Sequence, residues 1–314
     1  MKEIHITSYE ENQRVDKFLM KYLNKAPKSF IYKMVRKKNI KLNNKKIEGS
    51  EIIKEGDIIN VYLADDTLIK FKEDKEIKIV KKQFDVVYED ENLLICNKPI
   101  NMLSQPNSSE FSNSLVEQIG SYYINTNFKV GICNRLDRNT SGLVIAGKNI
   151  KALQVVNEMI KNHKISKFYL CIVKGRITSK IILKDFIIKD EKTNKVQVNK
   201  NKLSDQSKKI ETIIEPLKYT NDYTLLKVQI ITGKTHQIRA HLASIGNPII
   251  GDIKYGNPKV NDYFKSKYKL KSQLLHAYEL QFDEEEQFFS YLENKKFIAK
   301  KPMIFDKITK DILN

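Results

Sequence analysis

The sequence lacks any apolar segment long enough to cross a membrane. A spanning helix needs about 18 consecutive apolar residues, and no run in the 314 residues approaches that length. The opening residues, MKEIHITSYEENQ, also lack the apolar core of a secretory signal. Together the two absences argue against a membrane protein and predict a soluble chain that works in the cytoplasm.

Cysteine is scarce, and the cysteines that are present are not grouped. Cys96, Cys133 and Cys171 are odd in number, lie far apart and form no C-x-x-C pair. This spacing does not suit a zinc site or a disulfide framework, and it is typical of buried thiols in a reducing compartment. The sequence therefore predicts no metal centre.

Acidic residues are few relative to basic ones. The chain has 38 Asp and Glu against 56 Lys and Arg, which gives a formal charge of +18. Such an excess predicts a polyanionic partner, with nucleic acid ahead of an anionic membrane surface. Because Lys, Ile and Asn are all abundant, genomic bias is the plain alternative, and the distribution of the charge matters more than its total.

The basic residues are concentrated near the amino terminus. Positions 21–47 hold ten Lys or Arg residues and no acid, whereas positions 48–66 are rich in acid. A solvated face usually mixes both signs, so this block favours a surface that meets phosphates. The RNA contacts predicted within it are Lys28, Lys33, Arg36, Lys37, Lys38 and Lys45.

The same region has the periodicity of a small separate unit. RVDKFLMKYL and FIYKMVRKK place apolar residues at helical spacing, and NIKLNNKKIEGSEIIKEGDIINVYL reads as short strands separated by turns. Over residues 12–64 the pattern resembles the S4-like RNA-binding domain, in which two helices and a small sheet present basic side chains to structured RNA. We expect this α/β domain over residues 1–64 and a charged linker, with at most one strand, over residues 65–83.

Residues 84–314 predict one larger domain of mixed α and β structure. FDVVYEDENLLICNKP has the pattern of a hairpin, with two apolar runs around a polar turn. Strand-like runs (GLVIAG, FYLCIVKG, TLLKVQIIT, LLHAYELQF) then alternate with helical ones (KALQVVNEMIK, THQIRAHLASIG).

Three positions in this domain are candidates for chemistry, and each has an ordinary structural explanation. Asp137 precedes a loop sequence, so it is expected in a turn at a sheet edge, where it would simply cap the turn. Its neighbours Arg135 and Arg138 would help to keep it ionised. Tyr169 lies on one face of an alternating strand, as a core residue or as a ring that stacks on a base. Arg239 lies in a predicted helix, where a surface position is the plain alternative.

Two better-known motifs are excluded around Arg239. TGKT at positions 232–235 lacks the second glycine that a Walker loop has five residues before its lysine, because position 229 is Gln. His236 and His241 are five residues apart with no nearby Glu, which excludes the zinc-protease pattern.

Taken together, these segments resemble the motifs of the RluA/RluC/RluD family of RNA pseudouridine synthases, most of all the ribosomal large subunit enzymes of the RluC and RluD type. The matching patterns are R-L-D-x-x-T-S-G around Asp137, K-x-Y-x-x-x-V-x-G around Tyr169, T-G-K-T-H-Q-I-R-x-H-L with G-x-P-I-x-G-D-x-x-Y-G from Thr232 to Gly256, and LLHAYEL near Leu274. The resemblance covers residues 84–305. It implies an α+β catalytic domain with a central, mostly antiparallel mixed sheet flanked by helices and loops.

The resemblance also implies a reaction. These enzymes break the N-glycosidic bond of a uridine in RNA, rotate the bound base and rejoin it through carbon, without a cofactor because the exchange is redox-neutral. Asp137 matches the catalytic aspartate, which acts as a nucleophile or as a base at the ribose. Arg239 matches the arginine that pairs with it, and Tyr169 the tyrosine that packs on the target base and accepts or relays a proton. The target uridine must leave the RNA stack to reach the carboxylate.

The remaining expectations concern the partner. Contacts to RNA are expected from Arg135, Arg138, Lys234 and His236, while Asn134 stands where many relatives have His and cannot titrate near neutral pH. The expected substrate is bacterial 23S ribosomal RNA, with transfer RNA as the alternative, and the expected state is a monomer. A non-catalytic RNA-binding factor and a glycosidic hydrolase stay open as other classes. The modified positions do not follow from the sequence.

Overall fold

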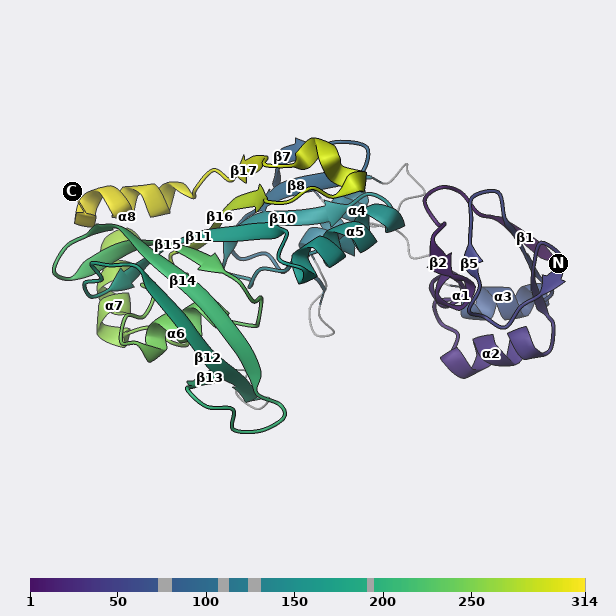
Figure 1. Cartoon of the computed structure of the whole chain (residues 1–314), viewed down its shortest axis with the longest axis horizontal. Helices are drawn as coiled ribbons and strands as arrows, with labels where there is room; N and C mark the ends of the chain where they lie inside the picture. Colours follow the sequence, from purple (N-terminus) through teal and green to yellow (C-terminus); the bar gives the residue numbers. More distant parts are fainter. Residues whose placement is uncertain (73–80, 107–112, 124–130, 191–194, 314) are drawn as a thin grey trace.

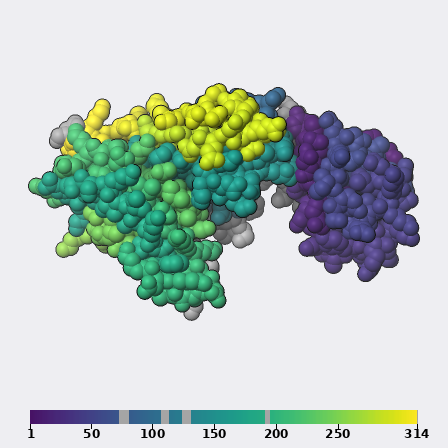
Figure 2. Space-filling view, viewed as in Figure 1, coloured from purple at the N-terminus to yellow at the C-terminus, as the bar shows by residue number. Residues whose placement is uncertain are grey.

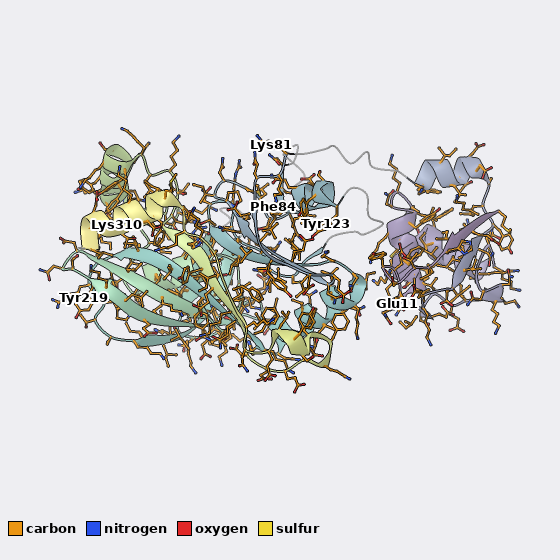
Figure 3. All side chains as sticks on the ribbon, turned by 90° about the horizontal axis from the view of Figure 1, so that it is seen from above. Glu11, Lys81, Phe84, Tyr123, Tyr219 and Lys310 are labelled. Carbon is orange, nitrogen blue, oxygen red and sulfur yellow. The ribbon has the colours of Figure 1, made fainter. Side chains whose placement is uncertain are left out.

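The computed structural model describes residues 1–72, 81–106, 113–123, 131–190 and 195–313. Figure 1 shows an elongated molecule, with a small amino-terminal unit at one end and a large sheet-based unit at the other. In Figure 2 the small unit, in purple, forms a lobe of its own. Figure 3 gives the view from above, with Glu11 on the small unit and Tyr219 and Lys310 at the far end of the large one.

The small unit is built around two helices, α1 and α2, and a four-stranded antiparallel sheet in the order β1-β6-β3-β4, to which the short pair β2-β5 and a third helix, α3, are added. Apolar residues of both helices pack on the sheet, and Val15, Leu19 and Ile31 are fully buried. Its elements are β1 (Lys2–His5), β2 (Gln13–Arg14), α1 (Val15–Tyr22), α2 (Lys28–Arg36), β3 (Ile40–Leu42), β4 (Lys45–Lys46), β5 (Ile52–Ile53), β6 (Ile58–Val61) and α3 (Asp65–Phe71). The predicted pair of helices followed by short strands is confirmed, and β1 is an additional strand that pairs with β6.

Helix α3 corrects the predicted linker. The sequence suggested a linker with at most one strand over residues 65–83, but Asp65–Phe71 is a helix that packs on the small unit. The rings of Phe30 and Phe71 lie 4.4 Å apart, and the Lys25 amide donates a hydrogen bond of 3.0 Å to the Phe71 carbonyl. A boundary at residue 64 therefore cuts the unit short. Residues 73–80 of the predicted linker lie outside the described part of the chain.

The large unit is organised around an eleven-stranded sheet whose main path is β13-β12-β14-β15-β11-β16-β10-β8-β7. Every pair along this path is antiparallel except β10 with β16. The mostly antiparallel mixed sheet is thus confirmed. Its strands are β7 (Asp85–Glu89), β8 (Leu93–Lys98), β9 (Gly131–Ile132), β10 (Ser141–Gly147), β11 (Ile165–Lys174), β12 (Ile181–Asp190), β13 (Lys195–Asn199), β14 (Lys208–Tyr219), β15 (Tyr223–Ile230), β16 (Leu275–Phe282) and β17 (Lys296–Ile298).

The middle of this sheet is buried on both faces. Alternate residues of β10 enter two different cores, with Val144 in one and Leu143 in the other. Helix α5 covers one face, and α4 and α6 cover the opposite face. The helices are α4 (Leu115–Tyr122), α5 (Ile150–Lys161), α6 (Gln237–Ser244), α7 (Pro258–Tyr268), the 3-10 helix η1 (Gln287–Leu292) and α8 (Met303–Leu313). Within the described ranges, no helix combines the length and apolar character that crossing a membrane requires.

Strands β12, β13 and β14 form an arm that the sequence reading did not identify. The arm is the green projection in Figures 1 and 2. Its apolar side chains pack with Ala240 of α6. After Asn247-Pro248 the chain forms an isolated bridge between Ile249 and Val173. The arm therefore supports α6, the helix that carries Arg239.

Candidate active site

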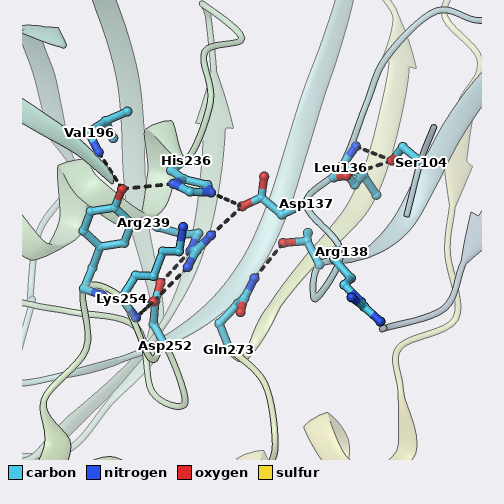
Figure 4. A network of polar contacts seen from close by, with 12 residues as sticks. Ser104, Leu136, Asp137, Arg138, Val196, His236, Arg239, Asp252, Lys254 and Gln273 are labelled. Atoms are coloured by element: carbon cyan, nitrogen blue, oxygen red, sulfur yellow. Dashed lines mark hydrogen bonds and ion pairs between the residues drawn. The ribbon is translucent and has the colours of Figure 1, made fainter. Parts of the chain in front are cut away.

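The centre of the site is the buried guanidinium of Arg239, which joins two carboxylates from distant parts of the chain. Its Nη1 donates to Oδ2 of Asp137 at 2.8 Å, while Nε and Nη2 donate to the two oxygens of Asp252 at 2.6 and 2.9 Å. Figure 4 shows this network. The predicted pairing of Asp137 with Arg239 is present, and the surface alternative for Arg239 is wrong because its side chain is only 6% exposed.

The loop that carries Asp137 is held by its backbone. The Thr140 amide donates to the Asp137 carbonyl at 3.0 Å, and the hydroxyl of Ser104 bonds both the amide and the carbonyl of Leu136. The predicted turn is present, but its predicted place at a sheet edge is wrong. Strand β10, which follows, lies between β16 and β8 inside the sheet and not at its edge.

Lys98 holds the same loop through hydrogen bonds to backbone carbonyl oxygens. Its fully buried ammonium group donates to the carbonyl oxygens of Pro99, Met102 and Arg138, at 3.0, 2.8 and 3.2 Å. Burial lowers the pKa of Lys98 to about 7, although the nearby charge of Asp137 opposes this shift. Position 138 is therefore fixed through its backbone, while the Arg138 side chain stays exposed.

Asp252 has no free oxygen left for chemistry. Besides the two bonds from Arg239, its Oδ1 accepts hydrogen bonds from the amides of Lys254 and Tyr255, at 2.8 and 3.1 Å. Burial opposes its ionisation, but the hydrogen bonds and charge of Arg239 outweigh burial and hold the pKa of Asp252 below its ordinary value. Asp252 was not predicted from the sequence to have a role. The sequence feature that could have indicated a role is that Asp252 is the only acidic residue between residues 223 and 256.

The arrangement leaves Asp137 paired with a buried cation and accessible. Burial would lower the pKa of Arg239, but the bonds and charges of Asp252 and Asp137 raise it well above its ordinary value, so the guanidinium stays charged. The Arg239 guanidinium is shared by two carboxylates, and Asp252 occupies the edge formed by Nε and Nη2. Asp137 is 28% exposed, and among the described residues only its Oδ2 is contacted by another side chain. Its Oδ1 is thus available to a substrate.

Tyr169 lies on β11 beside this carboxylate. It belongs to the same core as Leu136, with Cys171 and Val173 on its face of the strand as the alternation predicted. The pairing of β11 with β16 shifts register between Phe168 and Tyr169. Burial, helped by the charge of Asp137, raises the pKa of Tyr169 well above its ordinary value. The phenol is therefore protonated at neutral pH and is not a ready base, and the side chain is only 7% exposed, which fits the core alternative.

His236 lies closer to the Asp137 carboxylate than a contact to the RNA backbone would require. Its Nε2 lies 3.8 Å from Oδ2 of Asp137, and its Nδ1 lies 3.0 Å from the hydroxyl of Tyr255. Burial lowers the pKa of His236, and Arg239 lowers it further against the attraction of Asp137, so the imidazole is neutral at pH 7. Tyr255 was missed by the sequence reading, although it is the tyrosine of the quoted G-D-x-x-Y-G pattern.

The other predicted RNA contacts stay at the surface. Arg135, Arg138 and Lys234 are exposed on the two loops that frame Asp137 and the start of α6. The six predicted contacts of the small unit are also exposed, but they lie in a different domain: Lys28, Lys33, Arg36, Lys37, Lys38 and Lys45. Asn134 has a structural position, because its amide donates to the carbonyl of Leu143 and accepts from the amide of Ile145.

Comparison with known proteins decides the family. The sequence matches the RNA pseudouridylate synthase family over residues 92–244 and the S4 domain family over residues 13–59. An uncharacterized RNA pseudouridine synthase of Mycoplasma genitalium is 32% identical over 91% of this chain and 88% of its own length. This chain is an RNA pseudouridine synthase of that family. Ribosomal large subunit pseudouridine synthase C of Buchnera aphidicola is 31% identical to this synthase over 99% of the chain and 97% of the relative.

A solved structure agrees on the fold of the synthase. Human RNA pseudouridylate synthase domain containing 4 superposes with a TM-score of 0.57 at 21% identity, over 72% of this chain and 92% of the human one. With an S4 domain at its amino terminus and a catalytic family that consists of isomerases, the synthase is an RNA-modifying enzyme.

The double pairing of Arg239 gives a first prediction for this synthase. Asp252→Asn removes the charge that anchors the guanidinium, and breaking one side of a buried ion pair costs about 3 kcal/mol or more. We expect the free energy of unfolding in urea to fall by about that amount and the turnover of uridine to fall at least about tenfold. Asp262→Asn, at an exposed position on α7, is the matched control. Unchanged stability in Asp252→Asn would contradict the anchoring role.

Proposed function

We propose that Asp137, Arg239 and Tyr169 form the catalytic site of this synthase, and that its substrate is a uridine of 23S ribosomal RNA. The observation that carries the assignment is the accessible carboxylate of Asp137, held through one oxygen by a guanidinium that is 6% exposed. The substrate class is supported by the name and near-complete coverage of the Buchnera relative.

The proposed reaction begins when the target uridine leaves the RNA stack, at a cost of about a few kcal/mol. Oδ1 of Asp137 then acts at the ribose, as a nucleophile or as a base. The C–N glycosidic bond breaks, the uracil rotates while it stays bound, and a C–C bond forms in its place. All atoms are conserved, because the proton lost from the carbon that joins the ribose is balanced by one gained at the released nitrogen.

Arg239 and Tyr169 have different proposed roles in these steps. Arg239 fixes the orientation of the Asp137 carboxylate through a charge-assisted hydrogen bond of 2.8 Å. Tyr169 supplies a flat ring beside the carboxylate, on which the rotating uracil can pack. Because its phenol is protonated, it serves the base as a stacking partner and hydrogen-bond donor.

The small unit is proposed to hold structured RNA while the large unit acts on the uridine. Its basic residues converge at the end of α2 and on β4. The pKa of the Lys46 ammonium is lowered by the ammonium of Lys38 beside it, and Lys41 adds to this repulsion. Like charges gathered in this way bind phosphate oxygens and release counterions. We propose residues 1–72 as this RNA-binding domain and residues from about 84 as the catalytic domain.

The decisive experiment maps pseudouridines in ribosomal and transfer RNA from cells with and without the protein. Loss of one or more pseudouridines from 23S RNA, restored by the wild-type gene and not by Asp137→Asn, is the expected result. Loss confined to transfer RNA would overturn the ribosomal assignment and leave the enzyme class intact.

The basic surface gives a second prediction. Substituting Lys38, Lys45 and Lys46 by Gln should weaken binding to a ribosomal RNA fragment. Each lost phosphate contact lowers the slope of log affinity against log salt by about 0.7, so the slope should fall by about 2. Titrations at several salt concentrations measure both effects. The matched control replaces the exposed residues Lys265, Lys307 and Lys310, and an equal effect there would show that only total charge matters.

A further inference from the structure

A chain of hydrogen bonds runs from the arm to the proposed reacting carboxylate. The amide of Val196, on β13, donates to the hydroxyl of Tyr255 at 2.9 Å. That hydroxyl lies 3.0 Å from Nδ1 of His236, and Nε2 of the same imidazole faces Oδ2 of Asp137 at 3.8 Å. All these contacts are drawn in Figure 4.

Chemistry fixes the direction of the first bond in this chain, and the second follows from the acceptor that the phenol has. A backbone amide can only donate, so the Tyr255 oxygen accepts from Val196. Among the residues that the structure describes, the only other polar contact of that oxygen is Nδ1 of His236, which makes Nδ1 the acceptor that the phenolic proton has in this set. Nδ1 is then an acceptor without hydrogen, and the single proton of a neutral imidazole resides on Nε2.

Packing keeps His236 and Tyr255 in this relation. The two rings meet edge to face with their centres 5.6 Å apart, and the guanidinium of Arg239 lies 5.3 Å from the centre of the Tyr255 ring. His236 adopts a left-handed backbone conformation, with φ of 54°, immediately before α6. One tyrosine ring therefore contacts both groups that address Oδ2 of Asp137.

We propose that Tyr255 is a positioning residue that holds His236 as the tautomer with hydrogen on Nε2, aimed at Oδ2 of Asp137. With Arg239 Nη1 on the same oxygen, two N–H donors address Oδ2 and Oδ1 is the oxygen that reacts. The separation of 3.8 Å is longer than a hydrogen bond, and such contacts shorten when the substrate is bound. The inference rests on the proposed role of Asp137.

The chain of hydrogen bonds also connects the arm to the proposed reacting carboxylate. Val196 belongs to β13, which forms the outer side of the arm beside β12, and its amide is the group that orients the Tyr255 proton. The charged groups around His236 are Asp137, Arg239, Asp252 and Lys254. The arm thus sets the proton position of a side chain at the active site.

Nitrogen NMR of the full-length protein labelled in histidine tests the proposal directly. The wild type should show His236 with an unprotonated Nδ1 and a protonated Nε2, identified by loss of its signals in His236→Gln. In Tyr255→Phe, which keeps the ring and removes the hydroxyl, we expect a mixture of tautomers. A proton on Nδ1 in the wild type overturns the proposal, whatever the variants do.

Enzyme kinetics provide a second test of the proposal. With a uridine-labelled RNA, Tyr255→Phe should lower kcat about tenfold with little change in KM. The side-chain amide nitrogen of Gln reaches the position of the imidazole Nε2, so His236→Gln should retain most of the activity. The amide nitrogen of Asn reaches only the position of Nδ1, so His236→Asn should lose the activity. Tyr263→Phe, an exposed tyrosine on α7, is the control. Equal activity of the Gln and Asn variants would reject the role of Nε2.

The outcome is separable from the assignment of Asp137. If Asp137→Asn keeps full activity, the proposed catalytic site fails, whereas the tautomer of His236 is still read by NMR. If Asp137→Asn is inactive and the Gln and Asn variants do not differ, the role of His236 Nε2, and with it the positioning role of Tyr255, is rejected while the assignment of Asp137 stands.

Discussion

Replacing Asp137 by Asn should abolish pseudouridine formation and leave RNA binding intact. Asn has the same size and its carbonyl can still accept the bond from Arg239, but it cannot attack the ribose or remove a proton from it. Loss of a nucleophile or base that the reaction requires lowers the rate by about a thousandfold or more. Tritium released from uracil-labelled RNA measures turnover, and filter binding measures affinity for the same RNA.

The control for this experiment is Asp222→Asn, which changes an exposed aspartate in the turn before β15 and should release tritium at the wild-type rate. If Asp137→Asn also turns over normally, the carboxylate has no chemical role and the protein binds RNA without using this site. Free uracil in place of pseudouridine would instead indicate hydrolysis of the glycosidic bond.

Replacing Gly142 by Ala should prevent the catalytic domain from folding. Gly142 has φ of 117°, and a Cβ at this position would lie 2.2 Å from the carbonyl oxygen of Ala277. This is the point where β10 and β16 pair in parallel, so the clash is with backbone that cannot move aside. We expect insoluble protein, or a loss of unfolding free energy of about 3 kcal/mol or more, measured by urea denaturation.

The same substitution has the opposite expected sign at Gly120. This glycine lies within α4, and no atom comes within 4 Å of a Cβ placed there. Ala is favoured over Gly in a helix by about 1 kcal/mol, so Gly120→Ala should stabilise the protein. For Gly142→Ala, the contradicting result is wild-type stability, which would show that strands β10 and β16 can move apart without a cost in free energy.

The sequence was informative where chemistry depends on local pattern. Asp137 in a turn, Tyr169 on one face of a strand and Arg239 on a helix all follow from periodicity and motif. Asp252 and Tyr255 did not, because their roles depend on contacts with Arg239 and Val196, which are respectively 13 and 59 residues away along the chain. A bidentate ion pair of this kind leaves no periodic signal.

Two missed elements have related causes. Helix α3 is short, and Leu68 and Phe71 are only partly buried against the core of the small unit, so packing and not periodicity defines it. In the arm, Asp185 occupies a buried position of β12 and interrupts the apolar alternation that marks a strand. Its partner is His241 of α6, at 2.9 Å, which the local sequence cannot reveal.

The parallel pairing of β10 with β16 has a consequence for the order of synthesis and folding. Strand β10 ends at Gly147, but its parallel partner β16 begins only at Leu275. The sheet therefore cannot be completed until nearly the whole chain has left the ribosome. The small unit needs only its first 71 residues, and contacts close in sequence form faster than distant ones. A nascent chain can therefore hold RNA before it can modify it.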